Sequence, residues 1–229
     1  MSGTKVVVIA SGGMDSATLC YSLKEQGCDL ALVTFDYGQR HRAKEIAAAH
    51  SIHHLVQARS HAVIDLTSVG RLMTGNALTG DVAVPDGHYE AESMRVTVVP
   101  NRNAIMLSIA FGLAADWGAT AVATAVHGGD HHIYPDCRPV FISQFAAMEA
   151  TALDGVAHVG LLTPFLYWSK ADIARHGADL GVPFEWTWSC YKGGEVHCGS
   201  CGTCVERRQA FALAGVTDPT IYAITEVAP

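Results

Sequence analysis

The sequence is poor in charged residues and lacks both an apolar run of membrane-spanning length and a secretory signal. Charged side chains make up 16% of its 229 residues, and the formal net charge is −7 with histidine neutral. A negative balance argues against a broad nucleic-acid surface, which needs clustered lysine and arginine. The mostly apolar stretch 104–115 is too short to cross a bilayer. We therefore expect a cytoplasmic protein with no direct nucleic-acid partner and no membrane contact.

Disulfides are not expected either. Seven cysteines in a cytoplasmic chain indicate a metal site or free thiols, because that compartment keeps thiols reduced. Apolar residues make up 49% of the chain, which excludes a disordered protein. The length supports one sizeable core with a small appendage.

Strand and helix patterns alternate along the chain. Apolar runs predict strands at residues 6–10, 30–35, 54–57 and 120–126. Helical spacing predicts helices at 15–26, 42–50, 101–117, 141–153 and 171–180. This order indicates an α/β protein with a Rossmann-like parallel sheet and helices on both faces. Residues 60–98 are rich in glycine and proline, and we expect a loop-rich insertion or lid there.

The strongest motif is Ser-Gly-Gly-Met-Asp-Ser at residues 11–16, directly after the first strand. Gly12 and Gly13 allow close approach of an anion, and the free amides of the following helix start attract negative charge. The motif has no lysine, so it is not a Walker A loop, and its glycine spacing does not match the dinucleotide fingerprint G-x-G-x-x-G. We expect it to bind phosphate. In parallel sheets ligands lie at the carboxyl ends of strands, which places residues 11–16, 36–39 and 127–139 at one edge.

A second strong motif is formed by Cys190, Cys198, Cys201 and Cys204. Four thiolates within fifteen residues can surround one tetrahedral ion, and a closed four-cysteine set implies a structural role. Zinc is the favoured ion. Two alternatives remain open: an iron–sulfur cluster, and His197 in place of one cysteine.

Several single residues are candidates for chemistry. Arg138 and Asp136 lie on a proline-stiffened loop and suit a carboxylate and an N–C–N edge, although a surface salt bridge would look the same. Arg102 in the first turn of a helix is unfavourable for the helix dipole, so a ligand charge or solvent must hold it. Lys170 can reach a phosphate, or face solvent. Asp15 and Asp130 are candidate Mg²⁺ ligands, and Asp15 can alternatively serve the helix start. We expect His127, His131 and His132 to be pocket lining or surface.

These motifs together resemble one family. The glycine-rich loop resembles the PP-loop of ATP pyrophosphatases, which grips the β- and γ-phosphates of ATP. The whole set is similar to the 7-cyano-7-deazaguanine synthases of queuosine biosynthesis. The matching segments are residues 11–16, 35–39, 99–103, 134–139, 163–164, 169–170, 189–191 and 193–195, with the four cysteines.

The resemblance implies an adenine nucleotide alpha hydrolase fold, with an ATP-binding domain at 1–185 and a zinc-binding segment at 186–229. It implies an ATP-dependent ligase that converts 7-carboxy-7-deazaguanine and ammonia into 7-cyano-7-deazaguanine, with Mg²⁺, structural zinc and a homodimer. The expected catalytic residues are Asp15, Lys170 and Arg102, and the expected substrate contacts are Tyr37, Arg102, Asp130, Asp136 and Arg138. The expected ATP contacts are Ala10, Ser11, Gly12, Gly13, Met14, Asp15, Ser16, Phe35, Asp36 and Gln39.

Three alternatives remain. A tRNA thiolation enzyme would need a cationic RNA face and a reactive cysteine such as Cys137. Amidating ligases of the NAD or GMP synthetase type lack the four-cysteine segment. A nucleotide-binding zinc protein without turnover is the third. Val140 stands where the family is expected to carry an acidic residue, which leaves the substrate assignment open.

Overall fold

The computed structural model describes residues 3–89 and 91–224, which contain one five-stranded sheet. The strand order is β3-β2-β1-β4-β5, and every neighbouring pair is parallel. The parallel α/β prediction is therefore confirmed. The strands are β1 (Lys5–Ile9), β2 (Asp29–Asp36), β3 (Ser60–Asp65), β4 (Ala121–Ala123) and β5 (Gly160–Leu162).

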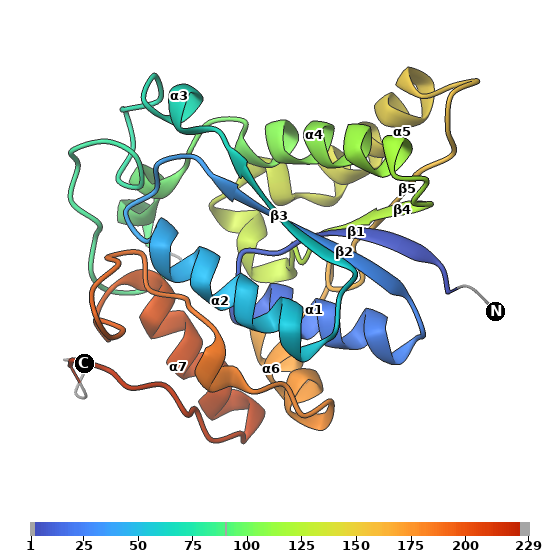
Figure 1. The fold of residues 1–229 in the computed structure, drawn as a ribbon. Coiled ribbons are helices and arrows are strands. Elements are labelled where there is room, and N and C mark those ends of the chain that lie inside the picture. Colours follow the sequence, from blue (N-terminus) through green and yellow to red (C-terminus); the bar gives the residue numbers. More distant parts are fainter. Residues whose placement is uncertain (1–2, 90, 225–229) are drawn as a thin grey trace.

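Helices cover both faces of this sheet (Figure 1). On one face lie α1 (Met14–Glu25), α2 (Arg42–Leu55), α6 (Lys170–Asp179) and α7 (Gly202–Ala214), and on the other lie α4 (Arg102–Asp116) and α5 (Pro139–Ala152). The connections also contain α3 (Thr67–Gly70), η1 (Glu92–Thr97), η2 (Gly128–His132), η3 (Pro135–Cys137) and η4 (Phe184–Trp186). Among the described residues, no helix combines the length and the apolar character that a membrane crossing needs.

The central strand β1 shows why the sheet is buried on both sides. Val6 and Val8 point into the core that contains α1 and α6, whereas Val7 points into the core that contains α4. All three are almost completely buried. A strand buried on both faces is a continuous apolar run, as in the sequence, and such strands are typical of parallel sheets.

The strand predicted at 54–57 is wrong. Residues up to Leu55 continue α2, because the buried helical stripe of Ala48 and Ala49 extends to Ile52, beyond the predicted helix end at residue 50. Gln57 has a positive φ of 51° and ends the turn, and the edge strand β3 follows at Ser60–Asp65. The segment predicted as a loop-rich insertion therefore begins with a strand.

The rest of that insertion contributes to a core of its own. Tyr89 and Met94 pack with Tyr134 and Cys137 beside the carboxyl ends of the strands. Asn76 holds the preceding turn, accepting hydrogen bonds from the amides of Leu78 and Thr79. The insertion is thus packed against the edge where we expect ligands.

The C-terminal segment packs closely against the sheet domain. Phe211 of α7 belongs to the core that contains α1. The Trp188 amide donates to the carbonyl of Gly12 at 2.9 Å, which joins this segment directly to the glycine-rich loop. Arg207 of α7 is fully buried and donates to the Thr187 hydroxyl at 2.8 Å and to the Phe184 carbonyl at 3.1 Å.

Candidate active site

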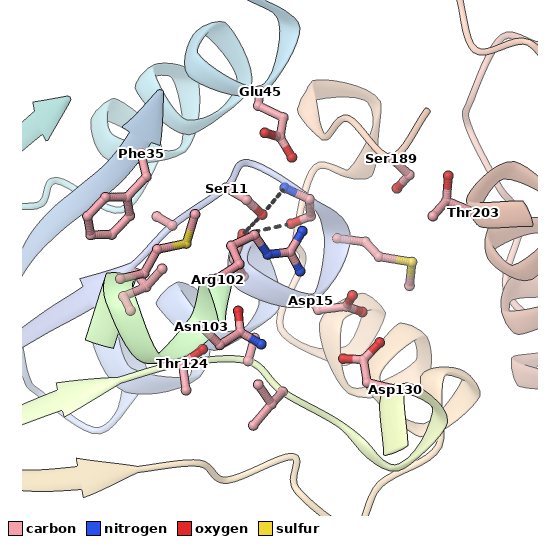
Figure 2. A pocket seen from close by; sticks show the side chains of 18 of the residues that line it. Ser11, Asp15, Phe35, Glu45, Arg102, Asn103, Thr124, Asp130, Ser189 and Thr203 are labelled. Carbon is pink, nitrogen blue, oxygen red and sulfur yellow. Dashed lines mark hydrogen bonds between the residues drawn. The ribbon is translucent and has the colours of Figure 1, made fainter. Parts of the chain in front are cut away.

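The glycine-rich loop connects β1 to α1 with the geometry of an anion cradle. Gly12 has a φ of +77°, and a Cβ there would lie 2.5 Å from the Ala49 amide nitrogen of α2. Gly13 is the N-cap of α1 and offers no side chain to its first-turn amides. Ser11 accepts from the Gly13 amide at 3.3 Å, and Ser16 donates to the Gly13 carbonyl at 3.1 Å (Figure 2). The loop therefore leaves donors free at a positive helix end.

Many predicted site residues line one cavity at this loop. They come from the ends of β1 and β2, the start of α4, the segment after β4, and α6. This is where the strand order reverses, between β1 and β4, and it is the usual ligand crevice of open α/β sheets. The predicted residues that line it are Ala10, Ser11, Gly13, Met14, Asp15, Ser16, Phe35, Tyr37, Arg102, Asp130 and Lys170.

Lys170 lies between two acidic groups at the floor of the cavity. Its Nζ is 3.1 Å from Asp15 Oδ2 and 2.8 Å from Glu206 Oε2. Burial alone would lower the pKa of Lys170, but Asp15 and Glu206 raise it above its usual value. Burial would likewise raise the pKa of Asp15, yet Lys170 and His127 bring it below its usual value. Asp15 and Lys170 are therefore both charged at neutral pH.

His127 lies beside the carboxylates of Asp15 and Asp130. Its Nδ1 accepts from the Gly129 amide at 3.1 Å, so the other ring nitrogen carries the proton. That Nε2 lies 3.8 Å from Asp15 and 3.6 Å from Asp130, and neither it nor Asp15 Oδ1 has a hydrogen-bond partner among the described residues. Sequence reasoning grouped His127 with pocket lining or surface, whereas it is an interior histidine facing two carboxylates.

Arg102 is a cation without an acidic partner. Its guanidinium makes no ion pair with any described residue, and its one hydrogen bond to them is a long contact of 3.4 Å to the Tyr37 hydroxyl. Its guanidinium lies 6.0 Å from the ring of Tyr37 and 5.6 Å from that of Tyr134. Burial raises the pKa of Tyr37 to about 12, so this phenol is neutral. The cavity therefore presents a positive charge surrounded by aromatic rings.

Gln39 and Asp36 shape the loop after β2 and do not line the cavity. Gln39 is fully buried, accepts from the Tyr37 amide at 3.0 Å and donates to Glu45 at 2.9 Å. Asp36 accepts from the Gly38 amide at 2.9 Å. Burial would raise the pKa of Glu45, but His41 and Gln39 lower it, so a carboxylate faces the cavity from α2.

Asp136 and Arg138 also lie outside the cavity lining. Asp136 Oδ2 accepts from the Asn103 amide at 2.8 Å and so anchors the start of α4, the helix that carries Arg102. Arg138 is exposed and donates to the His131 carbonyl at 2.9 Å. Val140 is 61% exposed, so an acidic side chain at that position would face solvent in the isolated chain.

The four cysteines converge on a metal-sized centre. Their sulfur atoms all lie within 4.8 Å of one another, and Cys198 Sγ is 3.8 Å from Cys204 Sγ. A tetrahedral zinc ion with bonds of about 2.3 Å has sulfur–sulfur edges of about 3.8 Å, so the residues fit zinc. The amides of Ser200 and Cys201 donate to Cys198 Sγ at 3.4 Å and 3.2 Å, which stabilises a thiolate. A multi-iron cluster would hold its thiolates farther apart, because each binds a different iron.

His197 is not one of the ligands, so that alternative is wrong. Its Nε2 accepts from the Ser189 amide at 3.1 Å, and its ring lies against Trp188 with centroids 4.2 Å apart. Burial lowers the pKa of His197 to about 4, so the ring is neutral and fills the interior of the segment.

Sequence reasoning missed the residues that complete the cavity from distant segments. Single aromatic or acidic residues outside a motif give no local signal, and only the packing of the C-terminal segment and of the insertion brings them here. They are His41, Glu45, Tyr89, Trp188, Thr203 and, beside Lys170, Glu206. Ser189 and Tyr191, from the matching segment 189–191, also line the cavity, although sequence reasoning assigned them no role there.

Comparisons with known proteins show the family of this chain. The family model described as "Queuosine biosynthesis protein QueC" matches residues 5–215. The 7-cyano-7-deazaguanine synthase of Paracoccus denitrificans is 58% identical over 95% of this chain and 93% of its own length. That of Ruegeria pomeroyi is 57% identical over 97% and 96%.

A solved structure supports the fold alone. The NMN synthetase of Francisella tularensis matches 94% of this chain and 79% of that chain, with a TM-score of 0.50 and 14% identity. The family match and the relatives carry the assignment: the chain belongs to the QueC family of queuosine biosynthesis proteins.

Proposed function

We propose that this chain is an ATP-dependent ligase that converts 7-carboxy-7-deazaguanine and ammonia into 7-cyano-7-deazaguanine, the compound in its relatives' name. One observation carries the proposal: the glycine-rich loop shares one cavity with Arg102, a half-buried cation that makes no ion pair with any described residue. The loop suits the phosphates of ATP, and Arg102 suits the carboxylate of an acid substrate.

The reaction uses ATP twice. A carboxylate oxygen is a poor leaving group, so attack on the α-phosphate first forms an acyl adenylate and releases pyrophosphate. Ammonia displaces AMP and forms the amide. The amide oxygen is adenylated in the same way, and loss of AMP and a proton leaves the nitrile. One cavity serves both steps because the acid and the amide are nearly equal in shape. Free ammonia is the simpler nitrogen source, since the chain shows no glutaminase-like cysteine motif.

The loop residues and Lys170 stabilise the departing pyrophosphate in this proposal. The free amides at the start of α1 face the β- and γ-phosphates, and Lys170 adds a positive charge beside them. The residues also fit Mg²⁺: Asp15 Oδ1 is buried and has no hydrogen-bond partner in the part of the chain that the structure describes, and Asp130 lines the same cavity. Mg²⁺ prefers one or two carboxylates plus substrate phosphates, and bound here it would neutralise phosphate charge.

Tyr37 and Arg102 recognise the acid substrate in this proposal. The guanidinium holds the carboxylate near the α-phosphate, while the ring of Tyr37 offers a flat apolar surface for the deazapurine. Asp136 acts indirectly, through the Asn103 amide that starts α4, and Arg138 supports the same loop through His131.

Zinc has a structural role in the proposal, and the active unit is a homodimer. Four cysteine ligands leave no open coordination position for substrate. The apolar side chains of Val140 and Met148 on α5 are exposed in the isolated chain, which suits a contact between subunits.

A tRNA thiolation reaction is disfavoured by the cysteine it would use. Cys137 is buried, accepts a hydrogen bond from Asn103 at 3.1 Å, and has a pKa raised well above its usual value by burial. A thiol held in its protonated form is a poor nucleophile.

The test is pyrophosphate release by zinc-containing protein with ATP, Mg²⁺ and ammonium, with and without 7-carboxy-7-deazaguanine, followed by the product mass. We expect substrate-dependent release and a nitrile product. Arg102→Met should abolish the substrate-dependent part, whereas the exposed control Arg71→Met should not. No release would contradict the proposal and favour another acid substrate or a nucleotide binder without turnover. If Arg138→Met lost substrate-dependent pyrophosphate release while Arg102→Met retained it, the role proposed for Arg102 would be contradicted.

A further inference from the structure

Four histidines gather at a place that the proposed reaction does not use. His50, His53 and His54 lie on the last turns of α2, and His61 lies on the edge strand β3. Figure 1 shows these two elements side by side. The ring centroids of His50, His53 and His61 form a nearly equilateral triangle with sides of 6.1, 6.0 and 5.9 Å. His54 lies 4.5 Å from His50 and 4.8 Å from His53. Every ring is therefore a neighbour of His50.

Hydrogen bonding leaves bare nitrogen lone pairs in this cluster. The Thr34 hydroxyl donates its one proton to the Ala10 carbonyl at 2.5 Å, because a carbonyl can only accept. His61 Nε2, which is 2.8 Å from the same hydroxyl, must then be the donor, and His61 Nδ1 keeps its lone pair. A histidine that donates one N–H to a fixed oxygen and presents its other nitrogen has the arrangement of a metal ligand.

The α2 histidines offer further lone pairs. His50 Nε2 and His54 Nε2 are 3.0 Å apart, and only one of the two can donate in that contact, so the other is an acceptor. His53 Nδ1 is buried and has no hydrogen-bond partner among the described residues.

We infer that His50, His53, His54 and His61 form a binding site for a divalent late transition ion of the zinc or nickel class. Imidazole nitrogens suit such ions, whereas Mg²⁺ and Ca²⁺ require oxygen. With metal–nitrogen bonds of about 2.0–2.1 Å, two rings on one ion have centroids about 5–5.5 Å apart, so small side-chain rotations around His50 close the site. Within the described residues, the four cysteines are the one set whose ligand atoms already converge, so the histidine side chains must rotate to bring their nitrogen atoms onto one ion.

The ion would join α2 to the edge strand. β3 has a neighbour on one side, β2, and α2 packs on both strands. α2 also supports the glycine-rich loop, since the Gly12 Cβ position lies 2.5 Å from the Ala49 backbone. The site is therefore expected to stabilise the fold without adding a group to the cavity.

The test uses Ni²⁺ as the probe, on full-length protein whose cysteine site already holds zinc. We expect calorimetry to show one Ni²⁺ equivalent per chain that excess Mg²⁺ does not displace, and a higher melting temperature with Ni²⁺. His50→Gln and His61→Gln should each weaken binding roughly tenfold or more and remove the thermal shift. The matched control is His158→Gln, at an exposed histidine outside the cluster.

Zinc content and far-ultraviolet circular dichroism show whether each variant is folded. A wild-type protein that binds no Ni²⁺ beyond its zinc would overturn the inference. So would an unchanged Ni²⁺ isotherm in folded His50→Gln and His61→Gln. Because the readouts are binding and melting, their outcome does not depend on the proposed ligase reaction.

Discussion

Replacing Lys170 by glutamine tests the charge balance beneath the cavity. Its ammonium group lies 2.8 Å from Glu206 and 3.1 Å from Asp15, and the three side chains are 13%, 13% and 21% exposed. Removing one member of a buried ion pair leaves an uncompensated charge and destabilises by about 3–5 kcal/mol. We therefore expect Lys170→Gln to lower the free energy of unfolding by about that amount near pH 8.

A second substitution separates charge from packing. Burial already raises the pKa of Glu206, although Lys170 opposes that rise. Glu206→Gln alone keeps Lys170 beside Asp15 and should remain within about 1 kcal/mol of wild type. The double variant, Lys170→Gln with Glu206→Gln, no longer has the uncompensated charge of Glu206. Its free energy of unfolding should therefore be about 1–2 kcal/mol higher than that of Lys170→Gln.

The same reasoning predicts a pH dependence. The pKa of glutamate in an unfolded chain is about 4.3. A carboxyl group whose pKa is higher in the folded protein stabilises the fold at pH values below its unfolded pKa. This contribution is lost as the pH rises through the folded pKa. Without Lys170, the pKa of Glu206 rises further, so the deficit of Lys170→Gln should be smaller near pH 5.5 than near pH 8.

The assay is urea unfolding of zinc-containing wild type, both single variants and the double variant at the two pH values. Lys24→Gln, at an exposed lysine of α1, is the control for loss of a lysine. The reasoning is refuted if Lys170→Gln costs less than about 1 kcal/mol near pH 8, or if Glu206→Gln worsens the deficit instead of relieving it.

Three further predictions concern the loop, the buried arginine and the metal. Gly12→Ala should abolish ATP binding in a calorimetric titration, because the added Cβ would clash with the α2 backbone. The control Gly27→Ala, also at positive φ but with open space around it, should bind ATP normally. Equal loss of binding in both variants would contradict the steric argument. Arg207→Met should lower the free energy of unfolding in urea by about 3–5 kcal/mol, because it leaves Asp218 without its ion-pair partner. Adding Asp218→Asn to this variant should restore part of the lost free energy. The absence of such recovery would refute the ion-pair explanation. Removal of zinc by a chelator should unfold the C-terminal segment and change tryptophan fluorescence reversibly, and unchanged fluorescence would contradict a structural metal.

Predictions that rested on local patterns agree with the structure. The parallel sheet followed from apolar runs alternating with helical spacing, and the loop at 11–16 lies where its glycines and the preceding strand indicated. The four cysteines converge because only short glycine-containing turns separate them. The strand at 54–57 failed because a short apolar run cannot distinguish a helix end from a strand, and the buried face of α2 decided it.

Predictions about the direction of single side chains were less successful. The rigid loop around Asp136 looks like a binding motif in the sequence, yet its carboxylate anchors the first turn of α4. A carboxylate that holds a helix start and one that holds a ligand share the same residue type and the same stiff surroundings. The sequence contains nothing that tells them apart.

The sequence alone determined the sheet type, the position of the glycine-rich loop and the convergence of the four cysteines, because each depends on residues close together in the chain. Only the tertiary structure decided what surrounds them. Glu206 reaches Lys170 across 36 positions, Tyr37 and Tyr134 meet at Arg102, and His61 completes a cluster begun on α2. Such contacts depend on how helices pack on the sheet and which way each side chain points, and no local spacing in the sequence records either.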